Sequence, residues 1–202
     1  MDTSTLKYEY APVNLEDAKI VIACTNKKRK LEDSKYNERR KECEDALAQL
    51  QSVIDINSLG DLTEEEFEIN KYAIRPETNA KRAKHAVYEN QRTIKAVKVL
   101  DEGNIAEFGR LMIESHNSLR DDYEVTGLEL DTLVEAALKH EGVIGSRMTG
   151  AGFGGCTVNI VRNHCIDSFI KNVGTEYKSI IGYDADFYVV EVGEGARRIF
   201  EV

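Results

Sequence analysis

The sequence has no long hydrophobic run. No stretch approaches the roughly 20 apolar residues that a membrane-spanning helix needs, and the opening MDTSTLKYEY is too polar for a secretory signal peptide. We therefore expect no membrane partner.

Cysteine and proline are also scarce. The four cysteines, at positions 24, 43, 156 and 165, form no closely spaced pair of the kind that binds zinc. Cys24 and Cys156 lie in apolar runs typical of strands, where cysteine usually acts as a small hydrophobic side chain. The sequence therefore predicts a reduced, cytoplasmic protein without a metal site of its own. The two prolines, Pro12 and Pro76, are far apart, and the chain contains no low-complexity segment or repeat.

Positive charge is in deficit, with a net charge of −9. This excludes general nucleic-acid binding, which needs a cationic surface that displaces counterions. The basic run 27–30 is followed at once by Glu32 and Asp33, so we interpret it as a solvated loop. A local basic spot on an acidic enzyme is still compatible with an anionic substrate such as a nucleotide.

The 202 residues, 42% hydrophobic and 31% charged, are sufficient for a globular core. Apolar spacing predicts strands over 7–13, 20–24, 143–148, 156–161 and 186–192. It predicts helices from an N-cap at Asp33 or Ser34 to Leu50, from Thr63 to about Tyr72, over 77–100, from Ile105, around 130–137 and over 167–177. Thr63 and Glu66 have the spacing of a capping box. The first of these helices has an apolar face of Cys43, Ala46, Leu47 and Leu50, and the helix over 77–100 has an apolar stripe that includes Ile94. Several helices around a few hairpin-linked strands indicate an α+β fold rather than a doubly wound sheet.

The most distinctive segment is a glycine-rich turn between two predicted strands. Residues 148–156 read MTGAGFGGC, with glycine at 150, 152, 154 and 155. Glycine allows positive φ angles and lets backbone N–H groups approach a ligand. The segment is not the dinucleotide-binding fingerprint, because a strand rather than a helix follows it, and no P-loop motif occurs. These residues alone fit either an anion-binding turn or a tight structural hairpin.

The residues in and around the turn resemble motifs of a known protein group. Residues 146–156, SRMTGAGFGGC, resemble the third conserved motif of the GHMP kinases. Three further segments are similar to galactokinases, a family within that group: SKYNERRKE at 34–42, KRAKHAVYEN at 81–90 and LMIESHNSLRDDY at 111–123. The four segments occur in the family's order and cover nearly the whole chain.

This resemblance implies a fold and a domain boundary. Residues 15–202 would form the GHMP kinase C-terminal domain, a ferredoxin-like sandwich of a mostly antiparallel sheet with packed helices. Residues 1–14 would be the end of a strand that belongs to an N-terminal domain. The sequence contains neither a GLSSS-like phosphate loop nor an R-x-N-L-x-G-E-H segment, the features that the family carries in its N-terminal half.

The resemblance also implies a function, the transfer of the ATP γ-phosphate to galactose to give galactose 1-phosphate. Tyr36 falls on the family's sugar-contacting tyrosine, although from the residues alone it could be an aromatic at a helix boundary. Lys28 would face the nucleotide phosphates. The turn would form a wall beside those phosphates through Gly150, Ala151, Gly152, Phe153, Gly154 and Gly155.

The expected cofactors are ATP and Mg²⁺, bound mainly by the N-terminal half. That half would also supply the catalytic base, so this chain alone is expected to be inactive. We interpret His116, Asp121 and Asp122 as parts of a polar network rather than as metal ligands. Arg39 and Arg40 are expected in surface or interdomain ion pairs.

Three alternatives remain open from the sequence. The protein could be a galactokinase-like sensor that binds sugar and nucleotide to regulate transcription. It could be a kinase for a related sugar such as N-acetylgalactosamine. It could also be a structural domain without a ligand.

Overall fold

The structure is a computed structural model of the chain and describes residues 1–27 and 32–193. Within these residues the chain forms six α-helices and a four-stranded sheet. The helices are α1 (Glu32–Leu50), α2 (Glu64–Asn70), α3 (Glu77–Asp101), α4 (Ile105–Asp121), α5 (Leu128–Leu138) and α6 (Ile166–Ile181). The strands are β1 (Ala18–Cys24), β2 (Val143–Thr149), β3 (Cys156–Arg162) and β4 (Asp186–Val190). Single 3-10 turns are η1 (Leu59–Asp61), η2 (Lys71–Ala73) and η3 (Asn163–Cys165).

The sheet has the strand order β2-β3-β1-β4, and every neighbouring pair is antiparallel. Strands β2 and β3 form a hairpin, β1 lies between β3 and β4, and α6 connects β3 to β4. This is the split βαβ arrangement of ferredoxin-like folds. The predicted α+β class, a ferredoxin-like sandwich with packed helices, is confirmed.

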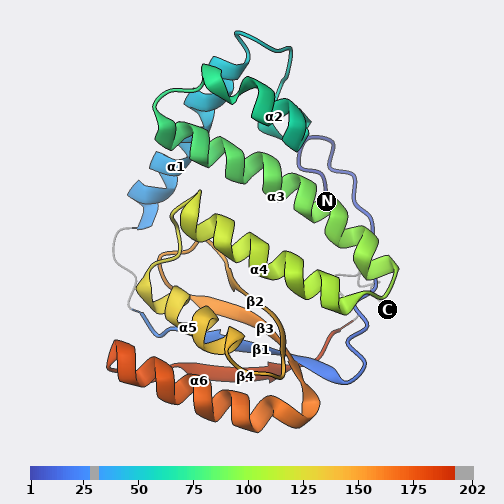
Figure 1. Ribbon diagram of the computed structural model, residues 1–202, viewed down its shortest axis with the longest axis vertical. Helices are drawn as coiled ribbons and strands as arrows, with labels where there is room; N and C mark the ends of the chain where they lie inside the picture. Colours follow the sequence, from blue (N-terminus) through green and yellow to red (C-terminus); the bar gives the residue numbers. More distant parts are fainter. Residues whose placement is uncertain (28–31, 194–202) are drawn as a thin grey trace, which may run out of the picture.

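The two faces of the sheet are covered by different helices, as Figure 1 shows. On one face, Val21 and Val161 pack against Phe169 and Tyr177 of α6. The opposite face meets α4, where Met112 packs in a cluster with Ala18 and Ile160 of the sheet. Successive side chains of a strand point to opposite faces, so the alternation in β1 and β3 builds both cores.

A helical layer lies beyond α4 and consists of α1, α2 and α3 (Figure 1). Its core contains Ala46, Leu50 and Phe67, with Cys43 and Leu47 packed against it, as the spacing predicted. The predicted capping box also forms at the start of α2. The Thr63 hydroxyl accepts from the Glu66 N–H at 3.2 Å, and the Glu66 carboxylate accepts from the Thr63 N–H at 2.9 Å.

Three predictions about elements were wrong in detail. Residues 7–13 form no strand in this chain, because no neighbouring strand pairs with their backbone among the described residues. Ile94 was placed on the buried stripe of α3 but is 54% exposed, although Val99 and Leu100 further along the same helix are buried. Helix α1 begins at Glu32, before the predicted N-cap at Asp33 or Ser34.

None of the helices in the described ranges is both long enough and apolar enough to cross a membrane.

Candidate functional site

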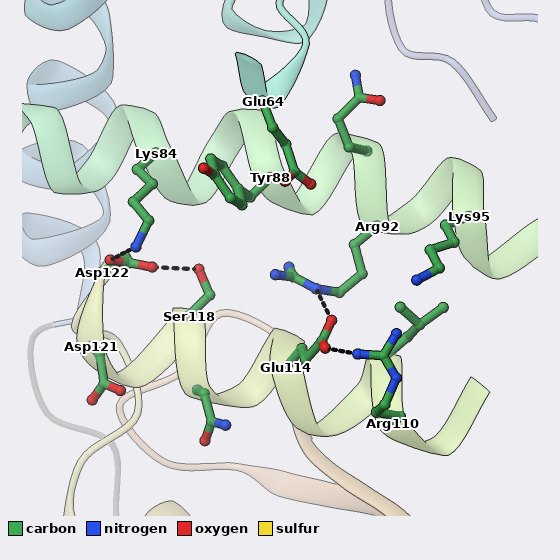
Figure 2. A pocket seen from close by; sticks show the side chains of 13 residues that line it. Glu64, Lys84, Tyr88, Arg92, Lys95, Arg110, Glu114, Ser118, Asp121 and Asp122 are labelled. Atoms are coloured by element: carbon green, nitrogen blue, oxygen red, sulfur yellow. Dashed lines mark hydrogen bonds and ion pairs between the residues drawn. The ribbon is translucent and has the colours of Figure 1, made fainter. Parts of the chain in front are cut away.

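A surface groove of about 560 Å³ lies between α3 and α4, and Figure 2 shows the charged side chains that line it. Lys84 Nζ lies 3.1 Å from an Asp122 carboxylate oxygen, and Arg110 pairs with Glu114. The Nε of Arg92 is 3.9 Å from the other Glu114 oxygen. Because each of these cations already has a carboxylate partner, the groove offers little uncompensated charge to an anionic ligand.

The glycine turn between β2 and β3 has an unusual backbone. Gly150, Gly152, Gly154 and Gly155 have φ angles of 85°, 87°, 142° and 88°. Phe153 also has a positive φ, at 58°, which is uncommon for a residue with a side chain. Ala151 is exposed at the tip. These angles confirm the predicted tight turn.

The turn packs closely against the segment that leads into α5. A Cβ atom at Gly152 would lie 2.1 Å from the carbonyl oxygen of Val125, so only glycine fits there. The same carbonyl accepts a hydrogen bond from the Phe153 N–H at 2.7 Å. The position of the turn is thus fixed by the backbone before α5.

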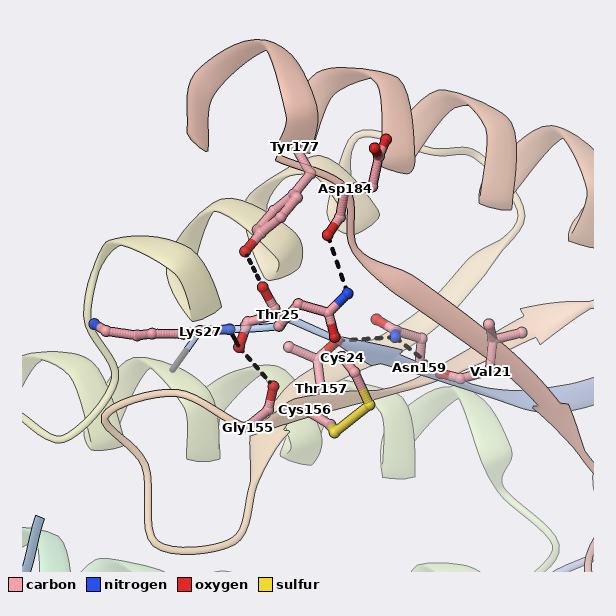
Figure 3. Close-up of a disulfide and its surroundings, with 11 residues drawn as sticks. Val21, Cys24, Thr25, Lys27, Gly155, Cys156, Thr157, Asn159, Tyr177 and Asp184 are labelled. Atoms are coloured by element: carbon pink, nitrogen blue, oxygen red, sulfur yellow. Dashed lines mark hydrogen bonds between the residues drawn. A yellow bond between two sulfur atoms is a disulfide. The ribbon is translucent and has the colours of Figure 1, made fainter. Parts of the chain in front are cut away.

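The end of β1 holds the other side of the turn, as Figure 3 shows. The Gly155 carbonyl accepts hydrogen bonds from the Thr25 N–H and the Thr25 hydroxyl, both at 2.8 Å. The buried Tyr177 hydroxyl donates to the Thr25 carbonyl at 2.6 Å. Burial, the largest cause, raises the pKa of Tyr177, so the hydroxyl keeps its proton for this bond. Residues of β1, α6 and the turn therefore form one connected unit.

The two cysteines beside this unit are joined by a disulfide, Cys24–Cys156 (Figure 3). The prediction that both act as separate apolar thiols was wrong in the structure. The β1–β3 register places them directly opposite each other, with Cα atoms 4.1 Å apart. The sequence could not show this register, because the two residues are 132 positions apart.

Lys27 is a basic residue at the turn that the sequence did not single out. Its alkyl chain lies beside Gly154, and its Nζ is 2.9 Å from a Glu129 carboxylate oxygen in the first turn of α5. Lys28, the residue predicted to face the phosphates, lies outside the described residues. A run of four basic residues gives no sign of which one points at the turn.

Tyr36 lies in the first half of α1 and is 60% exposed. The neighbouring Lys35 places its Nζ 5.7 Å from the centre of the Phe153 ring. The start of α1 therefore lies beside the glycine turn. The structure brings these two predicted site segments together and leaves Tyr36 accessible to a ligand.

A buried arginine supports this region from α3. Arg82 is 1% exposed and donates to Glu42 at 3.0 Å, to the Asp122 carbonyl at 2.6 Å and to Glu124 at 2.8 Å. The hydrogen bond from Arg82 lowers the pKa of Glu124. Glu124 directly precedes Val125, which contacts the turn. By bonding Glu124, Arg82 therefore helps to fix the backbone that makes this contact. This role could not be predicted from the sequence, because the residues KRAK at 81–84 have the composition of an ordinary charged helix face.

The acidic and basic residues weighed earlier are found in ion pairs. Asp121 pairs with Arg120 at 2.8 Å, as expected of a polar network. Arg39 is 6% exposed and bonds Glu42 at 2.6 Å, while Arg40 pairs with Glu44 at the surface. Across the part of the chain that the structure describes, no group of three or more His, Cys, Asp or Glu side chains could hold a metal ion.

The comparisons with known proteins give a consistent result. The sequence profile described as "GHMP kinases C terminal" matches residues 96–172. The galactokinases of Clostridium beijerinckii and Clostridium acetobutylicum are 64% and 60% identical over 199 residues, which is 98% of this chain and 51% of each relative. The crystal structure of Lactococcus lactis galactokinase complexed with galactose superimposes with a TM-score of 0.92 at 54% identity, covering 96% of this chain and 50% of that one.

The chain thus spans about half the length of the relatives that it matches. In sequence and in fold it belongs to the GHMP kinases and corresponds to the C-terminal half of the galactokinases.

Proposed function

We propose that this chain is the C-terminal lobe of a galactokinase, and that the intact protein transfers the γ-phosphate of ATP to galactose, giving galactose 1-phosphate and ADP. The observation that carries the proposal is the glycine turn, held by backbone contacts on two sides and lying beside the start of α1, the helix that carries the exposed Tyr36. The high identity to galactokinases along nearly the whole chain supports it.

Phosphoryl transfer depends mainly on positioning the reactants and on stabilising the charge of the transferring group. In the proposed role, the turn from Gly150 to Gly155 is the wall beside the nucleotide phosphates. Four of its residues are glycines with positive φ angles, so no side chain keeps the phosphates away from the backbone at these positions. The Tyr36 hydroxyl hydrogen-bonds a hydroxyl of galactose, and Lys28 contacts the nucleotide phosphates.

The proposal assigns the remaining chemistry to an N-terminal half. That half supplies the catalytic base and most ligands of Mg²⁺, which would neutralise phosphate charge when bound. Residues 1–14 belong to that domain and residues 15–202 form the C-terminal domain. The exposure of Leu6, Tyr8 and Tyr10, at 70%, 68% and 75%, supports a covering partner for this segment.

The test is the Tyr36→Phe substitution in the intact protein, with steady-state kinetics for both substrates. Losing one hydrogen bond to the sugar should raise the KM for galactose roughly 3- to 10-fold and leave the KM for ATP unchanged. Tyr72→Phe is the matched control, because Tyr72 is equally exposed, at 64%, in the remote η2 turn.

Each outcome bears on a different part of the proposal. An unchanged galactose KM in Tyr36→Phe would remove this residue from the sugar site. An intact protein that binds galactose and ATP without forming galactose 1-phosphate would overturn the enzymatic function in favour of a sensor. Preference for N-acetylgalactosamine would move the substrate to the related sugar.

A further inference from the structure

His116 is a buried titratable residue without a role in the site described so far. It lies in α4 and is 1% exposed. A buried polar side chain normally has hydrogen-bond partners, because leaving it unpaired costs free energy. Its two ring nitrogens therefore need to be accounted for.

The two nitrogens face different elements. Nδ1 accepts a hydrogen bond from the Met148 backbone N–H at 3.3 Å. A backbone N–H can only donate, so Nδ1 carries no proton, and the proton of the neutral ring is on Nε2. Nε2 lies 3.4 Å from an Asp131 carboxylate oxygen, within ion-pair distance but without hydrogen-bond alignment. Neither of these two atoms has another hydrogen-bond partner among the described residues.

The positions of the two partners matter more than the contacts themselves. Met148 is the penultimate residue of β2, two residues before Gly150 opens the turn. Asp131 lies in the first turn of α5, which follows Val125, the residue against whose backbone Gly152 packs. One imidazole ring thus contacts both β2, which leads into the glycine turn, and α5, whose preceding residue Val125 packs against the turn.

The hydrogen bonds that hold the rest of the turn come from other groups. The Thr25 bonds hold its β3 end, and the Val125 carbonyl holds its middle. The contact with His116 acts at the β2 end. Met148 and Leu130 of α5 also pack together in one apolar cluster, and the His116 ring adds the polar contacts between the β2 end of the turn and the first turn of α5.

We propose that His116 is a positioning residue that sets the glycine turn relative to the N-terminus of α5, through a neutral Nε2–H imidazole between Met148 and Asp131. Its effect on catalysis rests on the function proposed above. Its effect on the geometry of the turn does not.

The experiment compares three substitutions of His116 in the intact protein. His116→Ala removes both contacts. His116→Asn keeps an acceptor near the Nδ1 position, and His116→Gln keeps a donor near the Nε2 position. His164→Ala is the control, because this histidine is exposed in η3.

We expect His116→Ala to lower kcat about 100-fold, the scale reached when a supporting residue shifts reacting groups by about 1 Å. The KM for galactose should be unchanged, because the sugar is held elsewhere. His116→Asn should recover most of kcat and His116→Gln less, since the Met148 contact acts directly on the turn. Equal kcat in all three variants and the wild type would overturn the proposal.

Two measurements separate this proposal from the proposed function. Nitrogen-15 NMR of histidine-labelled wild type should show His116 as the neutral Nε2–H tautomer, and a proton on Nδ1 would overturn the proposal. Hydrogen exchange followed by mass spectrometry should speed up in His116→Ala over 149–155 and the start of α5 only. Unchanged exchange there, or equal acceleration everywhere, would contradict it.

The role of His116 can still be decided if the wild type is inactive or if one variant does not fold. If the wild type does not phosphorylate galactose, the proposed function fails while the exchange pattern still decides the role of His116. If His116→Ala does not fold, the tautomer in the wild type and the Asn and Gln variants provide the decision.

Discussion

At the residue scale, the glycines of the turn are not equivalent. Gly150 and Gly152 have nearly the same positive φ, 85° and 87°. A Cβ at Gly150 would meet nothing within 4 Å, whereas one at Gly152 would lie 2.1 Å from the Val125 carbonyl oxygen. Backbone strain therefore applies at both positions, and a steric clash applies only at Gly152.

This difference predicts unequal effects of the same substitution. Gly150→Ala should lower the free energy of unfolding by about 1 to 2 kcal/mol, the cost of a left-handed conformation for a residue with a Cβ. Gly152→Ala should cost more, and it should also displace Phe153 from its hydrogen bond to Val125. Thermal denaturation and galactose phosphorylation by the intact variants provide the measurement. Similar stability and activity in the two variants would contradict a special role for the Gly152 contact.

At the element scale, α4 crosses β2 at an unusually short distance. A Cβ at Gly109 of α4 would lie 2.1 Å from the Ile144 carbonyl oxygen, and one at Gly145 would lie 2.6 Å from the Gly109 Cα. Two glycines facing each other thus let a helix and a strand meet backbone to backbone. The crossing places His116, further along α4, beside the end of β2.

Gly109→Ala tests this crossing. In an open helix the change would stabilise by about 1 kcal/mol through helix propensity. Here we expect the opposite sign, a loss of about 1 to 3 kcal/mol, because overpacking must move backbone atoms. The control is Gly174→Ala in α6, where the nearest atom to a new Cβ is a Phe187 ring carbon at 3.3 Å. Stabilisation by Gly109→Ala in denaturant-induced unfolding would refute the close crossing.

The α3–α4 interface carries a pH-dependent group, His85. Its ring stacks on Tyr123 with centroids 4.5 Å apart, and its Nδ1 lies 3.0 Å from the Ser118 hydroxyl. Burial lowers the pKa of His85 from 6.5 to about 4, although the nearby Glu89 acts in the opposite direction. Between pH 6.5 and 4 the unfolded chain therefore binds a proton that the folded chain does not.

The sign of the effect follows from this proton. The free energy of unfolding should fall as pH drops from 6.5 to 4, and should not depend on His85 above that window. His85→Gln removes the titration, so wild type should lose more stability than the variant between pH 7 and pH 5. Thermal denaturation of both proteins at these pH values measures the difference, in which carboxylates common to both cancel. Parallel pH profiles would show that His85 does not titrate in this way.

Elements with their own local pattern could be predicted from the sequence. The capping box at Thr63 and the apolar face of α1 depend only on residues within one or two turns, and both were confirmed. The strand over 7–13 failed because a strand needs a partner, and alternation says nothing about where that partner lies. The prediction for Ile94 failed for a similar reason, since apolar spacing defines a face of α3 but does not show which positions of that face other elements cover.

At the scale of the whole molecule, the candidate site is built from distant parts of the chain. The turn was identifiable because four of its positive-φ positions are glycines, the residue type that adopts this conformation most easily. The groups that hold the turn were not, because Thr25 lies 130 residues from Gly155, and Arg82 acts through Glu124. A contact of this kind has no local sequence pattern. Lys27 and His116 were missed as neighbours of the turn for the same reason.

In the proposed function, the groups needed for phosphoryl transfer are divided between two halves of the intact protein. In the proposed function the described residues provide only the wall beside the phosphates and Tyr36, and no cluster of three or more metal-ligating side chains occurs among them. Positioning without a base or a metal site should not transfer a phosphoryl group at a useful rate. We therefore expect the 202-residue chain to release no ADP from ATP in the presence of galactose, and the chain preceded by an N-terminal half to do so.

The comparison needs a folded chain to be meaningful. Slow hydrogen exchange in β1 and β3 of the 202-residue chain would show that its sheet is intact, so that inactivity reflects absent groups rather than unfolding. The full-length Gly152→Ala variant is the matched control, because it retains both halves and alters only the wall. Galactose-dependent turnover by the folded 202-residue chain would show that the chemistry resides in this half. The catalytic groups would then have to be sought among its own ion pairs rather than in a second domain.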